Sequence, residues 1–336
     1  MHTQDKINKM YNYTKSDNKS IILGNSKTTP FLDLLKSKWD NVHEESGVFR
    51  YKINNLQEKI VGKYLLQLNP DRSTKRRQPE QIDKICQPFD ENKFNFNKVS
   101  PKEILFNMVK EKDSDVHTVL VNVSPISRYH SLLCPAVSKC LPQIITEDSL
   151  IVALEVMFLA QNRDLRIGFN SLCALASVNH LHYHLFIEPS TLPVETVKCK
   201  HIKGPLYSFE DYPAPGFCFQ ITSEDSINEI SRQIYKLISY LLENSIAHNL
   251  FITRGTNLVL ESDKEVVRVV IWPRKSSVGA KQFAAFNIAV LELSGWFPVY
   301  DEKDFRNLKP ETLEQELRKW KIADFSQLSD EVKSLF

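Results

Sequence analysis

The chain has 336 residues, of which 42% are hydrophobic and 25% are charged, and its formal net charge is +2 at neutral pH. This length suffices for one large core or two smaller ones, and the near-neutral charge excludes a broad basic surface for nucleic acid. A polar N-terminus and the absence of a long apolar run indicate neither a secretory signal nor a membrane protein. The six cysteines form no Cys-x-x-Cys pair, so we expect reduced thiols and a cytoplasmic protein.

The first half of the chain alternates helical and β-like patterns. Residues 1–28 are polar, and we expect them to be loosely structured. A helix is predicted from Thr29, which can cap it, and Pro30, which suits a first turn. The remaining predictions in this half are β structure over 48–68, an irregular segment over 75–98, strands over 117–123, 130–134 and 175–187, and a helix over 147–161.

The second half shows the same mixture of patterns. Its predicted elements are helices over 227–244, 284–296 and 311–320 and strands over 250–253 and 266–272. Together they predict an α+β fold with a mainly antiparallel sheet. We divide the chain into the loose N-terminus, a catalytic half over 29–200, and a half over 201–336 that completes the fold and the substrate pocket.

Three of the nine histidines occupy alternate positions, as His180, His182 and His184. On a strand, alternate side chains share one face, so these three rings are predicted to project together. Each ring has two nitrogens to satisfy and titrates near neutral pH. A purely structural row of exposed residues would be expected to contain Thr, Lys or Glu, so this motif indicates a functional site.

Two kinds of chemistry fit such a row. Neutral imidazoles on one face can bind zinc, with a fourth ligand from elsewhere in the chain. Alternatively, one imidazole can attack a phosphoanhydride and form a covalent phosphoramidate, while its neighbours stabilise the developing charge. Ser177, five residues before His182, could donate to a phosphoryl oxygen, and this favours the nucleophile.

The upstream sequence adds two elements to this pattern. A hydrophobic strand ends at Asn122, and the next predicted strand opens with His130. Together with the later His-x-His-x-His motif, this arrangement resembles the histidine-triad (HIT) superfamily. The resemblance implies a HIT-like antiparallel sheet with packed helices in two half-domains. It also implies that Asn122 approaches a ribose, that His130 is a supporting histidine, and that Asn170 matches a family asparagine upstream of the triad.

The same resemblance assigns different roles to the three histidines. His182 would attack the α-phosphorus and carry the nucleotidyl group. The backbone carbonyl of His180 would orient the His182 ring, and His184 would contact the phosphate or the leaving group.

Further blocks resemble the GDP-D-glucose phosphorylase family over about residues 60–300. They comprise residues 67–70, 75–77, 87–90, 94–96, 168–172, 213–217, 253–255, 274–277 and 285–287. Related plant-type GDP-L-galactose phosphorylases carry Gln at the third triad position, where this chain has His184, and this favours the animal-type enzyme.

The resemblance implies that GDP-D-glucose and inorganic phosphate react to form GDP and glucose 1-phosphate through a guanylyl-histidine. No cofactor or metal is implied, and a homodimer is compatible with the sequence. Arg72, with the basic residues 75–77, and Arg274 with Lys275 are candidate phosphate ligands because guanidinium groups match phosphate geometry. Surface charge is the alternative for both groups. Two other functions stay open: a HIT hydrolase or transferase acting on another nucleotide, and a non-enzymatic zinc- or nucleotide-binding module.

Overall fold

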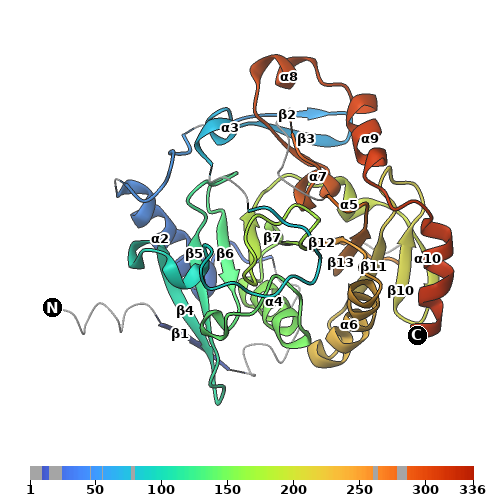
Figure 1. The fold of residues 1–336 in the computed structure, drawn as a ribbon, viewed down its shortest axis with the longest axis horizontal. Helices are drawn as coiled ribbons and strands as arrows, with labels where there is room; N and C mark the ends of the chain where they lie inside the picture. Colours follow the sequence, from blue (N-terminus) through green and yellow to red (C-terminus); the bar gives the residue numbers. More distant parts are fainter. Residues whose placement is uncertain are drawn as a thin grey trace.

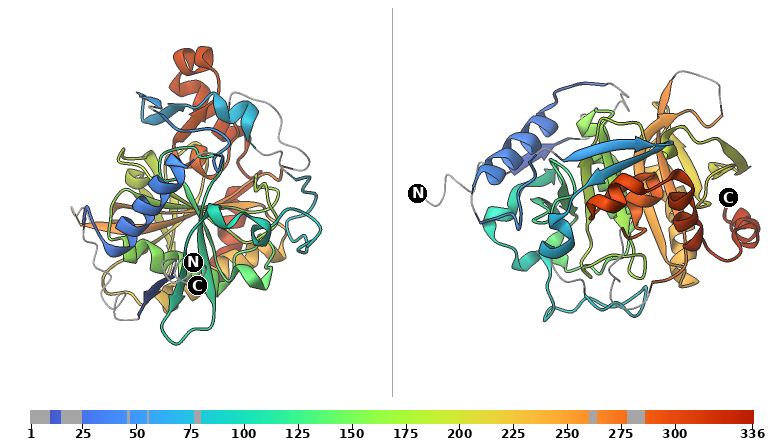
Figure 2. Two further views of the ribbon diagram at one scale, coloured as in Figure 1. Left: turned by 90° about the vertical axis from the view of Figure 1, so that its left-hand side faces the viewer. Right: turned by 90° about the horizontal axis from the view of Figure 1, so that it is seen from above.

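The computed structural model describes residues 10–14, 25–45, 47–54, 56–76, 80–259, 264–277 and 286–336. Within these residues, an eleven-stranded sheet runs through the molecule and a three-stranded sheet lies on one side of it (Figures 1 and 2). Every strand pair of the large sheet is antiparallel except β1 with β4. The predicted α+β class with a mainly antiparallel sheet is therefore confirmed.

The strands of the large sheet, in spatial order, are β1 (Met10–Tyr13), β4 (Ile104–Lys110), β5 (Val116–Val121), β6 (Ser131–Cys134), β8 (Tyr183–Ile187), β7 (Leu165–Asn170), β12 (His248–Thr256), β13 (Glu265–Pro273), β11 (Phe217–Ile221), β10 (Leu206–Phe209) and β9 (Cys199–Lys203). The small sheet contains β14 (Trp296–Val299), β3 (Tyr64–Leu68) and β2 (Gln57–Val61). The α-helices are α2 (Pro30–Glu44), α3 (Asp71–Lys75), α4 (Glu147–Ala160), α5 (Pro193–Thr196), α6 (Ile227–Glu243), α7 (Val290–Ser294), α8 (Glu302–Asn307), α9 (Pro310–Lys319) and α10 (Phe325–Val332).

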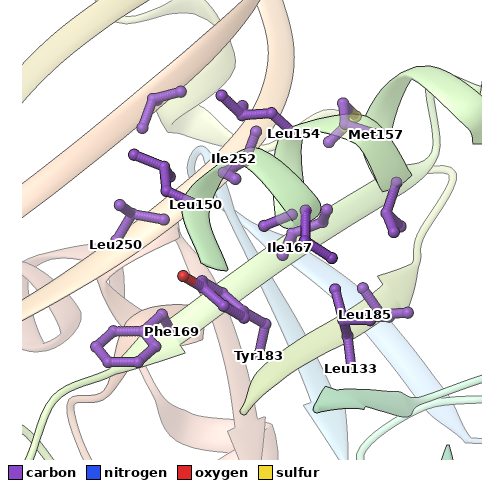
Figure 3. Packing of buried hydrophobic residues seen from close by; sticks show 14 of the residues in the cluster. Leu133, Leu150, Leu154, Met157, Ile167, Phe169, Tyr183, Leu185, Leu250 and Ile252 are labelled. Carbon is purple, nitrogen blue, oxygen red and sulfur yellow. The ribbon is translucent and has the colours of Figure 1, made fainter. Parts of the chain in front are cut away.

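Alternation along the strands divides most of their apolar residues between two large cores. On one face, α4 packs its Leu150, Leu154 and Met157 against inward residues of β7, β8 and β12 (Figure 3). The opposite face buries residues of the small sheet, α5, α7 and α9. Since Tyr183 and Leu185 belong to the first core, His184 between them points to the second side. That side carries the histidine cavity described below.

Most predicted helices are confirmed to within a few residues. Thr29 caps α2, because its hydroxyl accepts the backbone N–H of Leu32. The helices predicted over 147–161, 227–244 and 311–320 correspond to α4, α6 and α9. In α6 the apolar stripe at three- and four-residue spacing is buried against the sheet, as its periodicity indicates.

Three sequence predictions are wrong in extent. The strand predicted over 175–187 begins only at Tyr183; before it the chain turns, with positive φ angles at Cys173 and Leu175. The helix predicted over 284–296 covers only Val290–Ser294 among the described residues, because Gly295 ends it with a φ of 97° and Trp296 opens β14. Residues 284 and 285 lie outside the described ranges.

The third concerns the continuous β structure predicted over 48–68. Residues 49–53 form no strand, although Tyr51 is buried and its hydroxyl donates to the carbonyl of Pro125 at 2.6 Å. Only β2 and β3 are extended in this region. The Arg50 N–H also donates to the carbonyl of Val123 at 2.8 Å, so the turn after β5, rather than a neighbouring strand, holds this segment.

Residues near the N-terminus belong to the large sheet, and the same sheet crosses the predicted boundary near residue 200. Met10–Tyr13 pair with β4, and Tyr13 donates to Glu155 of α4, whereas residues 1–9 and 15–24 lie outside the described part. The large sheet continues across the predicted boundary through the β7–β12 pair. Among the described residues, no helix has the length and hydrophobicity needed to cross a bilayer.

Candidate active site

One cavity lies where β7 ends and β8 begins, and we call it the histidine cavity. It draws its lining from both halves of the sequence, including α3, the turn after β5, the segment before β8, and α7. The lining residues are Arg72, Arg76, Phe96, Asn122, Val123, Ser124, Ile126, Leu132, Asn170, Leu175, Ser177, Val178, His182, His184, Phe186, Asn287, Ala289, Val290, Leu291, Glu292 and Tyr300.

The His182 ring is held in one tautomer by the backbone. Its Nδ1 lies 2.8 Å from the carbonyl oxygen of His180, and a carbonyl can only accept, so Nδ1 carries the proton. In the neutral ring, Nε2 is then unprotonated and nucleophilic. The side chain is only 3% exposed, and Phe96 packs against it with ring centroids 5.0 Å apart. The carbonyl contact that the family resemblance implied for His180 is present.

His180 itself points away from the cavity. Its Nδ1 accepts the backbone N–H of Phe96 at 3.0 Å, and its Nε2 donates to the carbonyl of Val137 at 3.1 Å. Burial lowers the pKa of His180 to about 4, and the Val137 hydrogen bond offsets this only in part, so the ring is neutral. The prediction that all three histidines share one strand face is therefore wrong: His180 and His182 precede β8, and only His182 and His184 line the cavity.

This arrangement also bears on the zinc alternative. Both nitrogens of His180 are already hydrogen-bonded to the protein backbone. Within the described ranges, no group of three or more His, Cys, Asp or Glu side chains is arranged to hold a metal ion. The histidine motif thus does not converge on one point as a zinc site requires.

His130 lies behind His184 and determines its tautomer. The backbone N–H of Ile126 donates to His130 Nδ1 at 2.9 Å, so the neutral His130 ring carries its proton on Nε2. That Nε2 lies 3.0 Å from His184 Nδ1, which must accept. Burial, and then the neighbouring charges of His184 and Arg72, lower the pKa of His130 well below its usual range. A neutral His184 therefore carries its proton on Nε2.

Two asparagines also line the cavity. Asn122 accepts the Ser124 N–H with its Oδ1, and its Nδ2 lies 3.2 Å from the protonated Nε2 of His130, a contact between two donors rather than a hydrogen bond. Asn170 uses its Oδ1 to accept from Asn249 Nδ2 at 2.6 Å and from the Val290 N–H at 3.0 Å. Its Nδ2 is consequently the group that it can offer to a ligand.

Arg72 in the first turn of α3 and Arg76 directly after that helix place two cations in the cavity lining. Arg72 donates to the carbonyl of Ser124, and the Arg76 guanidinium lies 5.8 Å from the ring centroid of Tyr300. Ser177 lines the same cavity from the segment before His182. These groups are suited to an anion, because guanidinium and hydroxyl donors match phosphate oxygens. Arg77, the last of the basic residues, lies outside the described ranges.

Arg274 and Lys275 do not belong to the cavity lining. Arg274 is buried, stacks over Trp320 at 4.7 Å, and donates to Asn249 Oδ1 at 3.3 Å. Burial lowers its pKa to about 9 despite the opposing charge of Glu292. Since Asn249 holds Asn170, Arg274 is linked to the cavity at one remove, whereas Lys275 is exposed. Their role as phosphate ligands stays a prediction.

Sequence reasoning missed several residues that the fold brings to this region. Tyr300, Asn287 and Glu292 line the cavity from the C-terminal part of the chain, and Gln143 holds the backbone of His182. None belongs to a recognisable catalytic motif. Asn287 lies in the 285–287 block that resembles the family, whereas the others carry only their polarity as a signal, which by itself does not distinguish a site residue from a solvated one.

Comparison with known proteins shows the family of this chain. Residues 30–186 match the family model "GDPGP1-like, N-terminal domain", and residues 190–335 match "GDPGP1-like, C-terminal domain". GDP-D-glucose phosphorylase 1 of Xenopus laevis is 38% identical over 90% of this chain and 87% of its own length. The Homo sapiens protein of the same name is 39% identical over 83% of this chain and 76% of its length. GDP-L-galactose phosphorylase 2 of Arabidopsis thaliana is 29% identical, covering 94% and 77%.

A search of solved structures finds proteins with the same fold. Yeast Ap4A phosphorylase Apa2 superposes with a TM-score of 0.60 at 14% identity, covering 88% of this chain and 96% of the yeast chain. Its complex with Ap4A gives a TM-score of 0.59. The predicted HIT-like fold is thereby confirmed. With both domain models matched and relatives above 30% identity along most of its length, the chain belongs to the GDPGP1-like family of GDP-D-glucose phosphorylases.

Proposed function

We propose that this chain is a GDP-D-glucose phosphorylase, which converts GDP-D-glucose and inorganic phosphate into GDP and glucose 1-phosphate. The observation that carries the proposal is the tautomer of His182 in the cavity. Because Nδ1 donates to the His180 carbonyl, the neutral ring has its lone pair on Nε2 and can attack phosphorus without prior deprotonation. Relatives that bear this activity in their names match over most of the chain.

The reaction proceeds in two displacements. His182 Nε2 forms a bond to the α-phosphorus, and the bond from that phosphorus to the bridging oxygen breaks, releasing glucose 1-phosphate. An oxygen of inorganic phosphate then attacks the same phosphorus, and the phosphorus–nitrogen bond breaks to release GDP and restore His182. The adduct ring is cationic, and the His180 carbonyl stabilises it by keeping the Nδ1 proton. Two inversions give net retention at phosphorus.

His184 acts on the leaving group in this scheme. Its Nε2–H, set by His130, donates to the bridging or leaving phosphate oxygen. Glucose 1-phosphate leaves as a stable anion, so a hydrogen bond is sufficient and full proton transfer is not required. Arg72, Arg76 and Ser177 hold the phosphates beside the nucleophile. Holding two reactants in line in this way can contribute up to about 7–11 kcal/mol.

Intact-protein mass spectrometry tests the nucleophile directly. Mixing the protein with GDP-glucose in the absence of phosphate should add one guanylyl group to the wild type, and adding phosphate should discharge it as GDP. His182→Ala should form no adduct. The control is His201→Ala, which removes an exposed histidine on β9 and should leave the adduct intact. An adduct on His182→Ala would refute this assignment.

A second substrate class deserves a direct comparison, because the fold neighbour is named for Ap4A. Incubating the protein with GDP-glucose or Ap4A, each with and without phosphate, separates phosphorolysis from hydrolysis by the products formed. Faster turnover of Ap4A than of GDP-glucose would replace the proposed substrate. Dependence of GDP release on phosphate supports phosphorolysis.

We also infer a cytoplasmic location. All six cysteines are free, which is typical of a reducing compartment. Cell fractionation tests the location, and sedimentation of the purified protein tests the oligomeric state.

A further inference from the structure

Gln143 lies in the loop before α4 and contacts the backbone of two cavity-lining residues. Its Oε1 accepts the backbone N–H of His182 at 2.9 Å. Its Nε2 donates to two carbonyl oxygens, of His182 at 3.1 Å and of Asn170 at 3.0 Å. The residue is 1% exposed, so all three hydrogen bonds are shielded from water. One side-chain amide thus satisfies three backbone groups that no strand pairs.

The sheet register explains why these backbone groups need a partner. In the antiparallel β7–β8 pair, Gly168 faces His184. If the pairing continued, Asn170, two residues after Gly168, would face His182, two residues before His184. Their carbonyls are instead bridged by the Gln143 amide, which is inserted where the ladder opens. A peptide group could not replace it, because a peptide has one N–H whereas this amide uses two donor directions.

The loop that carries Gln143 is itself tied to the segment before His182. The Leu181 N–H donates to the carbonyl of Leu141 at 2.9 Å, and the Gln143 N–H donates to Asn179 Oδ1 at 2.9 Å. Together with the His182 N–H bond to Gln143, these contacts run in both directions. Leu181 and His182 donate to the loop, and the loop donates to Asn179. These hydrogen bonds therefore hold the Gln143 side chain in one conformation.

We propose that Gln143 is a positioning residue for the nucleophile. It separates the ends of β7 and β8, so that the side chains of Asn170 and His182 line one cavity at a set spacing, and it holds the His182 backbone where Nδ1 reaches the His180 carbonyl. This inference rests on the proposed function for its kinetic consequence, because the step it supports is attack by His182 Nε2. Its structural consequence, the His182 tautomer, is independent of the substrate.

Two substitutions separate positioning from bulk packing. Gln143→Leu preserves the approximate volume but leaves one N–H and two carbonyls without their partner. Gln143→Glu keeps the acceptor for the His182 N–H but places a carboxylate oxygen against two carbonyl oxygens. Burial and this repulsion raise the pKa of the introduced carboxyl, and its protonated form regains one O–H donor. The second variant is therefore rescued by acid, and the first is not.

The matched control is Thr253→Val. The Thr253 hydroxyl donates to Glu195 Oε1 at 2.7 Å, is equally buried, and lies outside the cavity lining. This variant also removes a buried hydrogen bond. It should lower the urea midpoint of unfolding and leave kcat within about twofold of the wild type, as expected when neighbouring catalytic groups are untouched.

Steady-state phosphorolysis of GDP-glucose gives the kinetic test. Gln143→Leu should lower kcat about 100-fold, with a much smaller change in KM, because a misplacement of roughly 1 Å costs about that factor. For Gln143→Glu, the ratio of its kcat to that of the wild type should rise as pH falls, whereas the ratio for Gln143→Leu should stay constant. A Gln143→Leu kcat within about twofold of the wild type, or a Gln143→Glu ratio independent of pH, overturns the inference.

Long-range ¹H–¹⁵N correlation spectra of the histidine rings give a second readout without substrate. The signals of His182 are assigned by their absence in His182→Ala. The wild type should show protonated Nδ1, and Gln143→Leu a mixture of tautomers; an unchanged tautomer overturns the inference. If the wild type forms no guanylyl adduct, the proposed function fails while this spectroscopic test still decides the role of Gln143. If Gln143→Leu does not fold, the nearly isosteric Gln143→Glu decides it.

Discussion

Replacing His180 by phenylalanine should destabilise the protein far more than it impairs the chemistry. The phenyl ring can keep the packing between Phe89 and Phe96, whose ring centroids lie 5.1 and 5.5 Å from the His180 ring. It supplies no partner for the Phe96 N–H or the Val137 carbonyl. Each unpaired buried group costs about 1–3 kcal/mol, so we expect a loss of about 3 kcal/mol in unfolding free energy near pH 7.

The pH dependence of this loss follows from the sign of the pKa shift. Burial lowers the pKa of His180 from 6.5 to about 4, so the unfolded chain binds the proton first as pH falls. The wild type therefore keeps the full contribution of His180 above pH 6.5 and loses it progressively towards pH 4. Between pH 7 and pH 5 this linkage removes about 2 kcal/mol from the wild type only. The deficit of His180→Phe should shrink by that amount, since the other buried histidines are common to both proteins.

Urea denaturation followed by circular dichroism at the two pH values measures this difference, provided that the m-values agree. His201→Phe, at an exposed position of β9, controls for the removal of a histidine. On the same preparations, the guanylyl adduct should persist, because the backbone carbonyl of residue 180 still accepts from His182 Nδ1. A deficit that is equal at both pH values would refute the assigned neutral state, and loss of the adduct in folded protein would refute the purely structural role of the ring.

Three further variants probe the surroundings of the cavity. Arg72→Ala should raise KM for GDP-glucose about tenfold or more in steady-state kinetics, since a hydrogen bond to a charged group contributes about 1.5–3 kcal/mol; an unchanged KM would place the phosphates elsewhere. His130→Leu removes the donor to His184 Nδ1 and should lower kcat at least about tenfold with little change in KM; equal changes in both would indicate a binding role. Glu195→Gln breaks the buried ion pair with Arg166, whose Nη2 lies 2.8 Å from Glu195 Oε1, and should cost about 3–5 kcal/mol in urea denaturation while kcat per folded molecule is retained.

The sequence predicted a large part of the cavity. Six residues that the sequence predicts for the site line this cavity: Asn122, Asn170, Arg72, Ser177, His182 and His184. These residues were identifiable because their chemistry is uncommon in their context, or because they lie in blocks that resemble a known family. His130 was also predicted, and it contacts His184 from behind. The structure thus brings these residues together at one cavity, and their catalytic roles stay proposals.

The sequence prediction was wrong for the orientation of His180. The alternate spacing of His180, His182 and His184 predicts a common face only if all three lie on a strand. The strand begins at Tyr183, and the preceding turn directs His180 to Phe96 and Val137 instead. Gln143 was overlooked because a polar residue in a loop carries no periodic signal.

The sequence by itself determined the four long helices α2, α4, α6 and α9, through a cap or apolar spacing, and the histidine motif with its chemistry, because these properties are local. Only the tertiary structure decided which ring nitrogens carry protons and where β8 begins. Those outcomes depend on partners distant in sequence: Phe96 meets His180 across 84 residues, His130 meets His184 across 54, and Gln143 meets His182 across 39. A hydrogen bond between such groups exists only after the chain has folded, so no local pattern can encode its geometry.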